Sequence, residues 1–166
     1  MPESATPAPG TMPLKLLFVC THNRCRSILC EALARHLGGE RVAAFSAGSR
    51  PAGEVHPDTI AQLAARGIDT RGLVSQSWDD FADLAPDAVI TVCDDAAGEQ
   101  CPLWMGASVK VHWGLPDPSR IIEGPQRDAA FAAVMDTIED RLRRLLEAGD
   151  DTGRGDSLRR ALAQLA

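Results

Sequence analysis

The segment Cys20-Thr21-His22-Asn23-Arg24-Cys25-Arg26-Ser27 lies between an apolar run and a stretch in which apolar and polar residues are mixed. The run before it, Leu14 to Val19, predicts a buried strand, and the residues after it, up to Leu37, predict a helix. The backbone N–H groups of a loop in this position can converge on a tetrahedral oxyanion, and the helix adds the positive end of its dipole. The segment therefore predicts an anion-binding loop between a strand and a helix.

Three side chains of this loop point to chemistry as well as binding. Arg26 can contact two oxygens of an anion at once through its forked guanidinium. The positive surroundings favour the thiolate form of Cys20, which would then face the central atom of the anion. Ser27 is placed either to cap the helix or to donate a hydrogen bond to that thiolate. The simpler interpretation is a buried cysteine that ends a strand, with Arg26 in solvent.

The composition is that of a soluble globular protein. The chain has 166 residues, 45% hydrophobic and 24% charged, enough for one domain with a real core. A net charge of −6 argues against general nucleic-acid binding. No apolar run reaches the roughly 18 residues of a membrane span, and residues 1–11 lack the apolar centre of a signal peptide. We therefore expect a cytoplasmic protein, and a monomer.

The rest of the chain reads as alternating strands and helices. We expect strands at 42–45, 73–75, 88–93 and 109–113, helices at 27–37, 57–66 and 126–148, and a helical turn at 77–81. Residues 1–13 are expected to be disordered and 14–149 to form the domain. Residues 150–166 are expected to be a flexible extension with a short helix. This alternation predicts an α/β fold with a parallel sheet covered by helices on both faces.

Parallel sheets bind ligands at the carboxyl ends of their strands. Cys20 and Cys93 fall at the ends of two predicted strands, and Asp117 lies just beyond a third, so we expect all three at one edge of the sheet. Prolines on both sides of Asp117 stiffen its turn, as a general acid that must stay within hydrogen-bond reach would need. Surface Asp-Pro turns are common, however, and this is the alternative.

The spacing of Cys20, Arg26 and Ser27 after a first strand resembles the loop of the low-molecular-weight tyrosine phosphatase family, which includes arsenate reductases. The resemblance covers residues 14–148. It implies a four-stranded parallel sheet in a Rossmann-like three-layer sandwich. It also implies that Cys20 is the nucleophile and Asp117 the general acid. The residues expected around the oxyanion are Thr21, His22, Asn23, Arg24, Cys25 and Arg26.

The residues after Asp117 depart from the phosphatases of this family. Those enzymes usually continue with aromatic residues that line a slot for the phosphotyrosine ring. Here Ser119 and Arg120 follow, and the chain contains no tyrosine. The departure favours a small, free oxyanion as the substrate. A phosphatase and a non-enzymatic anion-binding module are the alternatives.

Two further cysteines, Cys93 and Cys101, match a pair that the arsenate reductases of this family carry, although their interval is slightly longer. The resemblance implies that Cys20 attacks arsenate, that Cys93 then attacks Cys20, and that Cys101 moves the disulfide to where thioredoxin can reduce it. Glutaredoxin with glutathione, or mycothiol, is the alternative reductant. Two buried cysteines without a redox role are the simpler interpretation.

The interval between these two cysteines predicts a rearrangement. If residues 93–101 were helical, their ends would lie about 12 Å apart, whereas a disulfide needs Cα atoms within roughly 7 Å. We therefore expect the segment to change conformation on oxidation.

Some thioredoxin-coupled reductases of this family bind potassium beside the loop through Asn, Glu, Ser and Asp side chains. Asn23, Glu31 and Ser46 match three of these positions, but Gln76 stands where the Asp would be. A potassium site and a purely structural polar network are both open at this point. No tightly bound cofactor is expected.

Overall fold

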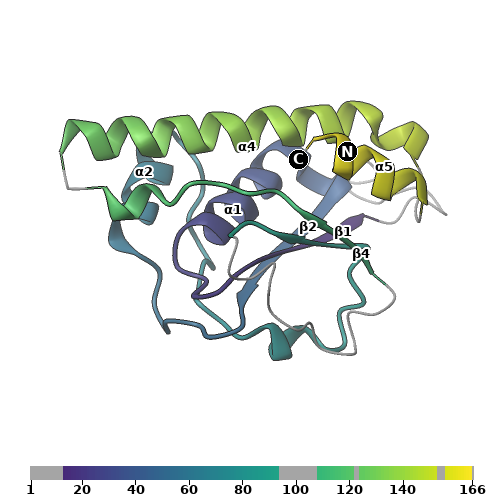
Figure 1. Ribbon diagram of the computed structural model, residues 1–166, viewed down its shortest axis with the longest axis horizontal. Coiled ribbons are helices and arrows are strands. Elements are labelled where there is room, and N and C mark those ends of the chain that lie inside the picture. The colour runs from purple at the N-terminus through teal and green to yellow at the C-terminus, as the bar shows by residue number, and fades with distance from the viewer. Residues whose placement is uncertain (1–12, 94–107, 122–123, 153–155, 166) are drawn as a thin grey trace, which may run out of the picture.

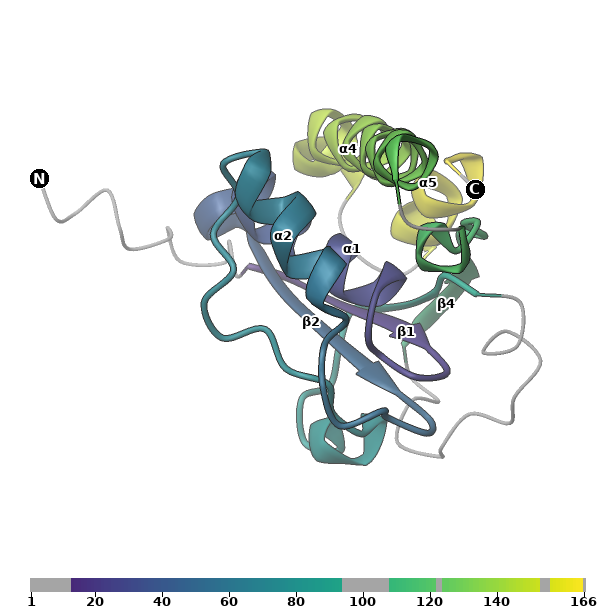
Figure 2. The same ribbon diagram turned by 90° about the vertical axis from the view of Figure 1, so that its left-hand side faces the viewer.

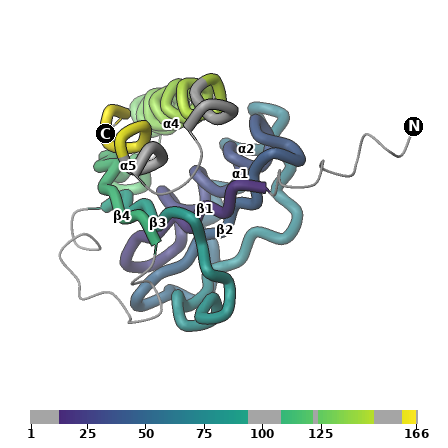
Figure 3. The backbone as a smooth tube through the Cα atoms, turned by 90° about the vertical axis from the view of Figure 1, so that its right-hand side faces the viewer, coloured from purple at the N-terminus to yellow at the C-terminus, as the bar shows by residue number. Residues whose placement is uncertain are grey.

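The computed structural model describes residues 13–93, 108–121, 124–152 and 156–165, without the side chains of 148–152 and 156–159. The described residues form a four-stranded parallel sheet in the order β2-β1-β3-β4 (Figure 3). Its strands are β1 (Leu14–Cys20), β2 (Val42–Gly48), β3 (Ala88–Thr91) and β4 (Val109–His112). The predicted α/β fold with four parallel strands is confirmed.

Strand β1 lies in the middle of the sheet because it pairs with β2 on one side and β3 on the other. Residues 16–20 of this strand are all buried. A strand covered on both faces needs apolar side chains in both directions, which explains why residues 16–20 are all apolar and do not alternate with polar residues.

Three helices lie on one side of the sheet, namely α1 (Arg26–Gly38), α4 (Pro125–Thr152) and α5 (Asp156–Gln164) (Figures 1 and 2). Helix α1 sits between the sheet and α4, so most of its residues are buried. Helix α2 (Pro57–Ala65) packs beside α1, and the 3-10 helix η3 (Trp78–Phe81) lies on the opposite side of the sheet. There the ring of Phe81 packs on that of Phe45, with centroids 5.6 Å apart.

Several element boundaries differ from the sequence-based predictions. Strand β2, predicted at 42–45, continues through Gly48 because it pairs with β1 as far as Cys20. The strand predicted at 73–75 does not form, and the chain joins β2 just after it, at a bridge between Gly48 and Ser77. The strand predicted at 88–93 ends at Thr91.

The C-terminal part of the chain packs on the sheet. Helix α4 runs past Gly149, where the sequence predicted its end, to Thr152. A glycine inside a helix costs only about 1 kcal/mol, so it does not have to end one. Helix α5 follows, its Leu162 is fully buried, and the indole N–H of Trp113 donates to the Leu162 carbonyl at 3.0 Å. Among the described residues, no helix is both long and apolar enough to span a membrane.

Candidate functional site

The anion loop, residues 20–27, connects the end of β1 to the first turn of α1. A neighbouring segment, residues 50–56, holds three of its carbonyls through main-chain hydrogen bonds of 2.9 Å, donated by Arg50, Ala52 and His56. Gly48 approaches the loop so closely that a Cβ atom there would lie 2.5 Å from the carbonyl oxygen of Thr21. The loop is therefore held in one backbone conformation by its neighbours.

The Cys20 thiol is within hydrogen-bond distance of a buried hydroxyl, that of Ser27. Its Sγ lies 2.9 Å from Ser27 Oγ, and the Asn23 amide donates to the same Oγ at 2.8 Å. The backbone N–H of Gln76 donates to Asn23 Oδ1 at 2.8 Å, which fixes the amide orientation. Ser27 Oγ can accept from Asn23 and donate at the same time, so it is placed to donate to Cys20 Sγ whenever that sulfur is a thiolate. Helix α1 has no side-chain cap, so Ser27 does not cap it.

A cavity of about 200 Å³ opens above this thiol. The C-terminal ends of β1 and β3 and the segment after β4 contribute to it, as expected for a parallel sheet. The predicted residues that line it are Cys20, Thr21, His22, Arg24, Cys25, Arg26, Cys93 and Asp117. Asn23 is fully buried and its side chain lies outside the cavity, where it supports the loop.

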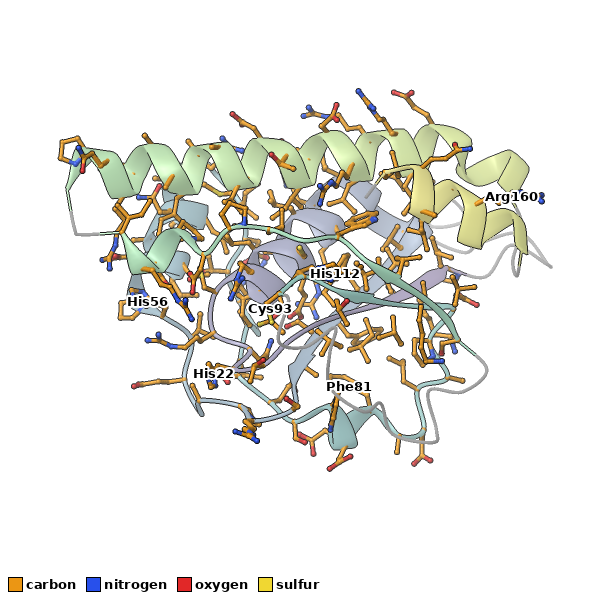
Figure 4. The ribbon with its side chains drawn as sticks, in the orientation of Figure 1. His22, His56, Phe81, Cys93, His112 and Arg160 are labelled. Atoms are coloured by element: carbon orange, nitrogen blue, oxygen red, sulfur yellow. The ribbon has the colours of Figure 1, made fainter. Side chains whose placement is uncertain are left out.

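Cys93 lies at the wall of this cavity, next to the anion loop. The backbone N–H of Thr21 is 3.3 Å from Cys93 Sγ, and the Thr21 hydroxyl is 3.6 Å away. Cys93 and His22 come from different segments and both line the cavity (both are labelled in Figure 4). Cys101, and with it the segment predicted to rearrange, lies outside the described residues.

The Asp117 loop, residues 116–121, brings a carboxylate to the same cavity. Asp117 Oδ1 accepts from the backbone N–H of Ser119 at 3.0 Å and from its hydroxyl at 2.6 Å. Asp117 Oδ2 lies 3.7 Å from a guanidinium nitrogen of Arg26 and 3.5 Å from one of Arg120. Arg26 also donates to the Leu115 carbonyl at 3.0 Å, so it joins the two loops.

Sequence reasoning did not assign Ser119 and Arg120 to the site, although both line the cavity. The signal for Arg120 was its position three residues after Asp117, where a short helical turn brings the two side chains together. Ser119 carried no signal of its own, since a serine after Asp-Pro fits any surface turn.

Two further cysteines of the described residues, Cys25 and Cys30, are buried. Burial raises the pKa of the Cys25 thiol to about 12, and it raises the pKa of the fully buried Cys30 still further. Both are therefore thiols at neutral pH.

Among the histidines, His22 is exposed and its Nδ1 donates to the Arg50 carbonyl at 3.2 Å.

The potassium candidates form a closed hydrogen-bond network. Asn23 Nδ2, a donor, faces Ser46 Oγ at 3.0 Å, and that hydroxyl donates to Glu31 Oε1 at 2.5 Å. The other Glu31 oxygen pairs with Arg35. Burial raises the pKa of the Glu31 carboxyl. Asn23, Ser46 and Glu31 therefore form one polar network beneath the anion loop.

Comparison with known proteins agrees with this geometry. The family described as Low molecular weight phosphotyrosine protein phosphatase matches residues 15–155. The Arsenate reductase of Bacillus licheniformis is 34% identical over 137 residues, which cover 81% of this chain and 96% of the relative.

Two solved structures superpose on most of the described fold. One, called "An arsenate reductase in the phosphate binding state", has a TM-score of 0.67 and 32% identity and covers 80% of this chain and 96% of its own. The thioredoxin-dependent arsenate reductase of Corynebacterium glutamicum has a TM-score of 0.66 and 27% identity, over 88% of this chain and 66% of its own. With the family match over most of its length, the chain belongs to the low molecular weight phosphotyrosine protein phosphatase family.

Proposed function

We propose that this protein is an arsenate reductase in which Cys20, Cys93 and Cys101 pass one disulfide along and thioredoxin reduces it. The observation that carries the proposal is a second sulfur in the anion site: Cys93 Sγ lies against the Thr21 N–H and lines the same cavity as Cys20 and Arg26. A phosphatase has no step that needs a thiol there. Proteins named arsenate reductases match about 80% of the chain, which supports the arsenate reductase part of the proposal.

In the first step the anion loop and Arg26 bind arsenate, and the Cys20 thiolate forms a sulfur–arsenic bond. One arsenic–oxygen bond breaks, and Asp117 donates a proton so that this oxygen leaves as water. The hydrogen bond from Ser27 supports the thiolate before attack. The carboxylate lies near Arg26, so both can reach one bound anion.

In the second step the Cys93 thiolate attacks Cys20 Sγ. A disulfide forms between these two, and the electron pair of the sulfur–arsenic bond stays on arsenic, which leaves as arsenite. Cys101 then attacks Cys93, which forms a Cys93–Cys101 disulfide and releases Cys20 as a thiolate. The dithiol of thioredoxin supplies the two electrons that reduce this last disulfide.

A tyrosine phosphatase is the second candidate, because the anion loop and Asp117 would serve phosphate-ester hydrolysis equally well. The cavity wall disfavours it as the main activity. Ser119 and Arg120 line the site at the place where an aryl ring would need apolar contacts, and its volume of about 200 Å³ suits a small anion.

The test is arsenate-dependent NADPH oxidation with thioredoxin and thioredoxin reductase, run in parallel with a glutaredoxin and glutathione system and with mycothiol. Cys93→Ser and Cys101→Ser should each lose multiple turnover and still bind arsenate. Cys30→Ala is the matched control, because Cys30 is buried in α1 and does not line the cavity. It should turn over like the unmodified protein.

Each result leads to a different conclusion. Turnover by Cys93→Ser or Cys101→Ser with thioredoxin would contradict the relay. If the unmodified protein turns over only with glutaredoxin or only with mycothiol, that thiol system, and not thioredoxin, is the reductant. Efficient hydrolysis of an aryl phosphate without arsenate reduction would favour the phosphatase.

A further inference from the structure

Arg127, in the first turn of α4, uses its whole guanidinium to join three parts of the molecule. Its Nε donates to the Ile121 carbonyl and its Nη2 to the Ser119 carbonyl, both at 2.8 Å. Its Nη1 pairs with Asp58 in the first turn of α2. The side chain is only 16% exposed, so water screens these contacts weakly. One partly buried guanidinium therefore fastens the Asp117 loop to two helices.

The contacts continue from Arg127 to the carboxylate of the site. Arg127 holds the carbonyl of Ser119, and the N–H and hydroxyl of the same residue donate to Asp117 Oδ1. Arg120 and Arg26 approach only the other carboxylate oxygen. The orientation of the Asp117 carboxyl therefore depends on where Ser119 is held.

We propose that Arg127 is the positioning residue for Asp117, an inference that rests on the proposed role of Asp117 as the proton donor. It does not line the cavity and acts through Ser119. A lysine could not replace it, because a single ammonium group cannot reach two carbonyls and a carboxylate in fixed directions.

The competing explanation is that Arg127 only ties α2 to α4. Arg66 provides the matched control, because it also joins these helices through pairs with Asp136 and Glu139 and is similarly shielded, at 26% exposed. Its partners lie on α4 and it does not line the cavity. Arg66→Ala should therefore reproduce the loss of helix–helix attachment without disturbing the Asp117 loop.

The experiment compares Arg127→Ala, Arg127→Lys and Arg66→Ala in a single turnover, with enzyme in excess over arsenate and arsenite measured after rapid quench. Both Arg127 variants should be slowed at least about 10-fold, within the range that misplacement of a proton donor causes. Arg66→Ala should stay within about twofold of the unmodified protein. In an Asp117→Asn background, Arg127→Ala should slow the reaction by no more than about twofold, because the group it positions is already lost.

A structural readout separates failure of this inference from failure of the proposed function. Amide hydrogen exchange at Ser119 should become at least about 10-fold faster in Arg127→Ala and stay unchanged in Arg66→Ala, whatever the substrate is. Unchanged exchange in Arg127→Ala would overturn the positioning role. So would equal slowing by Arg66→Ala, or full slowing in the Asp117→Asn background. If the unmodified protein reduces no arsenate but the two variants still show the expected exchange rates at Ser119, only the proposed reductase function is overturned.

Discussion

The anion loop and the Asp117 loop face the same cavity but are held by different means. The anion loop is fixed by main-chain hydrogen bonds from residues 50–56 and by the buried amide of Asn23. Residues 116–121, the Asp117 loop, are held beyond local turn hydrogen bonds by charged side chains from elsewhere: Arg26 lies 3.7 Å from the Asp117 carboxylate, and Arg127 donates to two carbonyls of the loop. The binding half of the site is thus rigid by backbone packing, whereas the half that would move a proton depends on a few side chains.

This difference has a chemical consequence. An anion cradle must present its N–H groups before the ligand arrives, and neutral, buried hydrogen bonds respond little to salt or pH. A proton donor must instead keep one oxygen within reach of a leaving group while its charge changes. In this site Ser119 fixes Asp117 Oδ1, and Oδ2 faces Arg26. This arrangement would keep one carboxylate oxygen in place for the proposed proton transfer.

The largest effect is expected where the anion loop meets β2. Gly48→Ala would place a Cβ atom 2.5 Å from the Thr21 carbonyl oxygen and 3.0 Å from that of Cys20, both of them backbone atoms. The loop would have to shift, at a cost of about 3 kcal/mol in the free energy of unfolding. Phosphate and arsenate binding, measured by calorimetry, should be lost.

The control for Gly48→Ala is Gly72→Ala, at an open position with φ of +81°. It should lower the free energy of unfolding by about 1 kcal/mol through its backbone conformation alone and leave anion binding intact. Normal anion binding by Gly48→Ala would show that the loop is not fixed by this close approach.

An intermediate effect separates the two loops directly. Ser119→Ala removes the 2.6 Å hydrogen bond to Asp117, and Ser75→Ala removes a 3.1 Å hydrogen bond to the His22 carbonyl of the anion loop. Each should cost up to about 1 kcal/mol of stability. Only Ser119→Ala should slow single-turnover arsenite formation, about 3- to 10-fold, because main-chain hydrogen bonds still hold the anion loop in Ser75→Ala. Equal rates in the two variants would contradict the comparison.

The smallest effect concerns Glu31, beneath the anion loop. Burial raises the pKa of this carboxyl in the folded state, so the folded protein binds the proton more tightly than the unfolded chain does. Stability is then lost as pH rises above about 4.5, where unfolded glutamates ionise. Glu31→Gln cannot ionise and still offers Ser46 an acceptor. Urea unfolding at pH 4.5, 6 and 7.5 should therefore show a smaller loss of stability in this variant.

The control is Asp69→Asn. Arg71 lowers the pKa of the exposed Asp69 to about 2, so both its folded and unfolded values lie below the range tested. This variant should follow the unmodified protein between pH 4.5 and 7.5. If Glu31→Gln loses as much stability as the unmodified protein between pH 4.5 and 7.5, or more, the pKa of Glu31 is not raised in the folded state.

Much of the architecture followed from short-range patterns. The apolar run of β1, the spacing from Cys20 to Arg26 and the rule for parallel strand ends placed Cys20, Cys93 and Asp117 at one edge. The contributions of Gly48 and Arg127 could not be predicted in this way. Gly48 matters because two strands bring its Cα against the anion loop, and Arg127 matters because α4 begins beside the Asp117 loop.

The sequence by itself determined the parallel sheet, the position of the anion loop and the family, because these depend on periodicity and on residues a few positions apart. The tertiary structure alone decided which way the Asn23 amide points, that the Ser27 hydroxyl lies against Cys20, that Cys93 rests on Thr21, and what holds Asp117 in place. The physical reason is that hydrogen-bond direction and charge pairing depend on where distant segments pack, and a one-dimensional pattern does not contain that information.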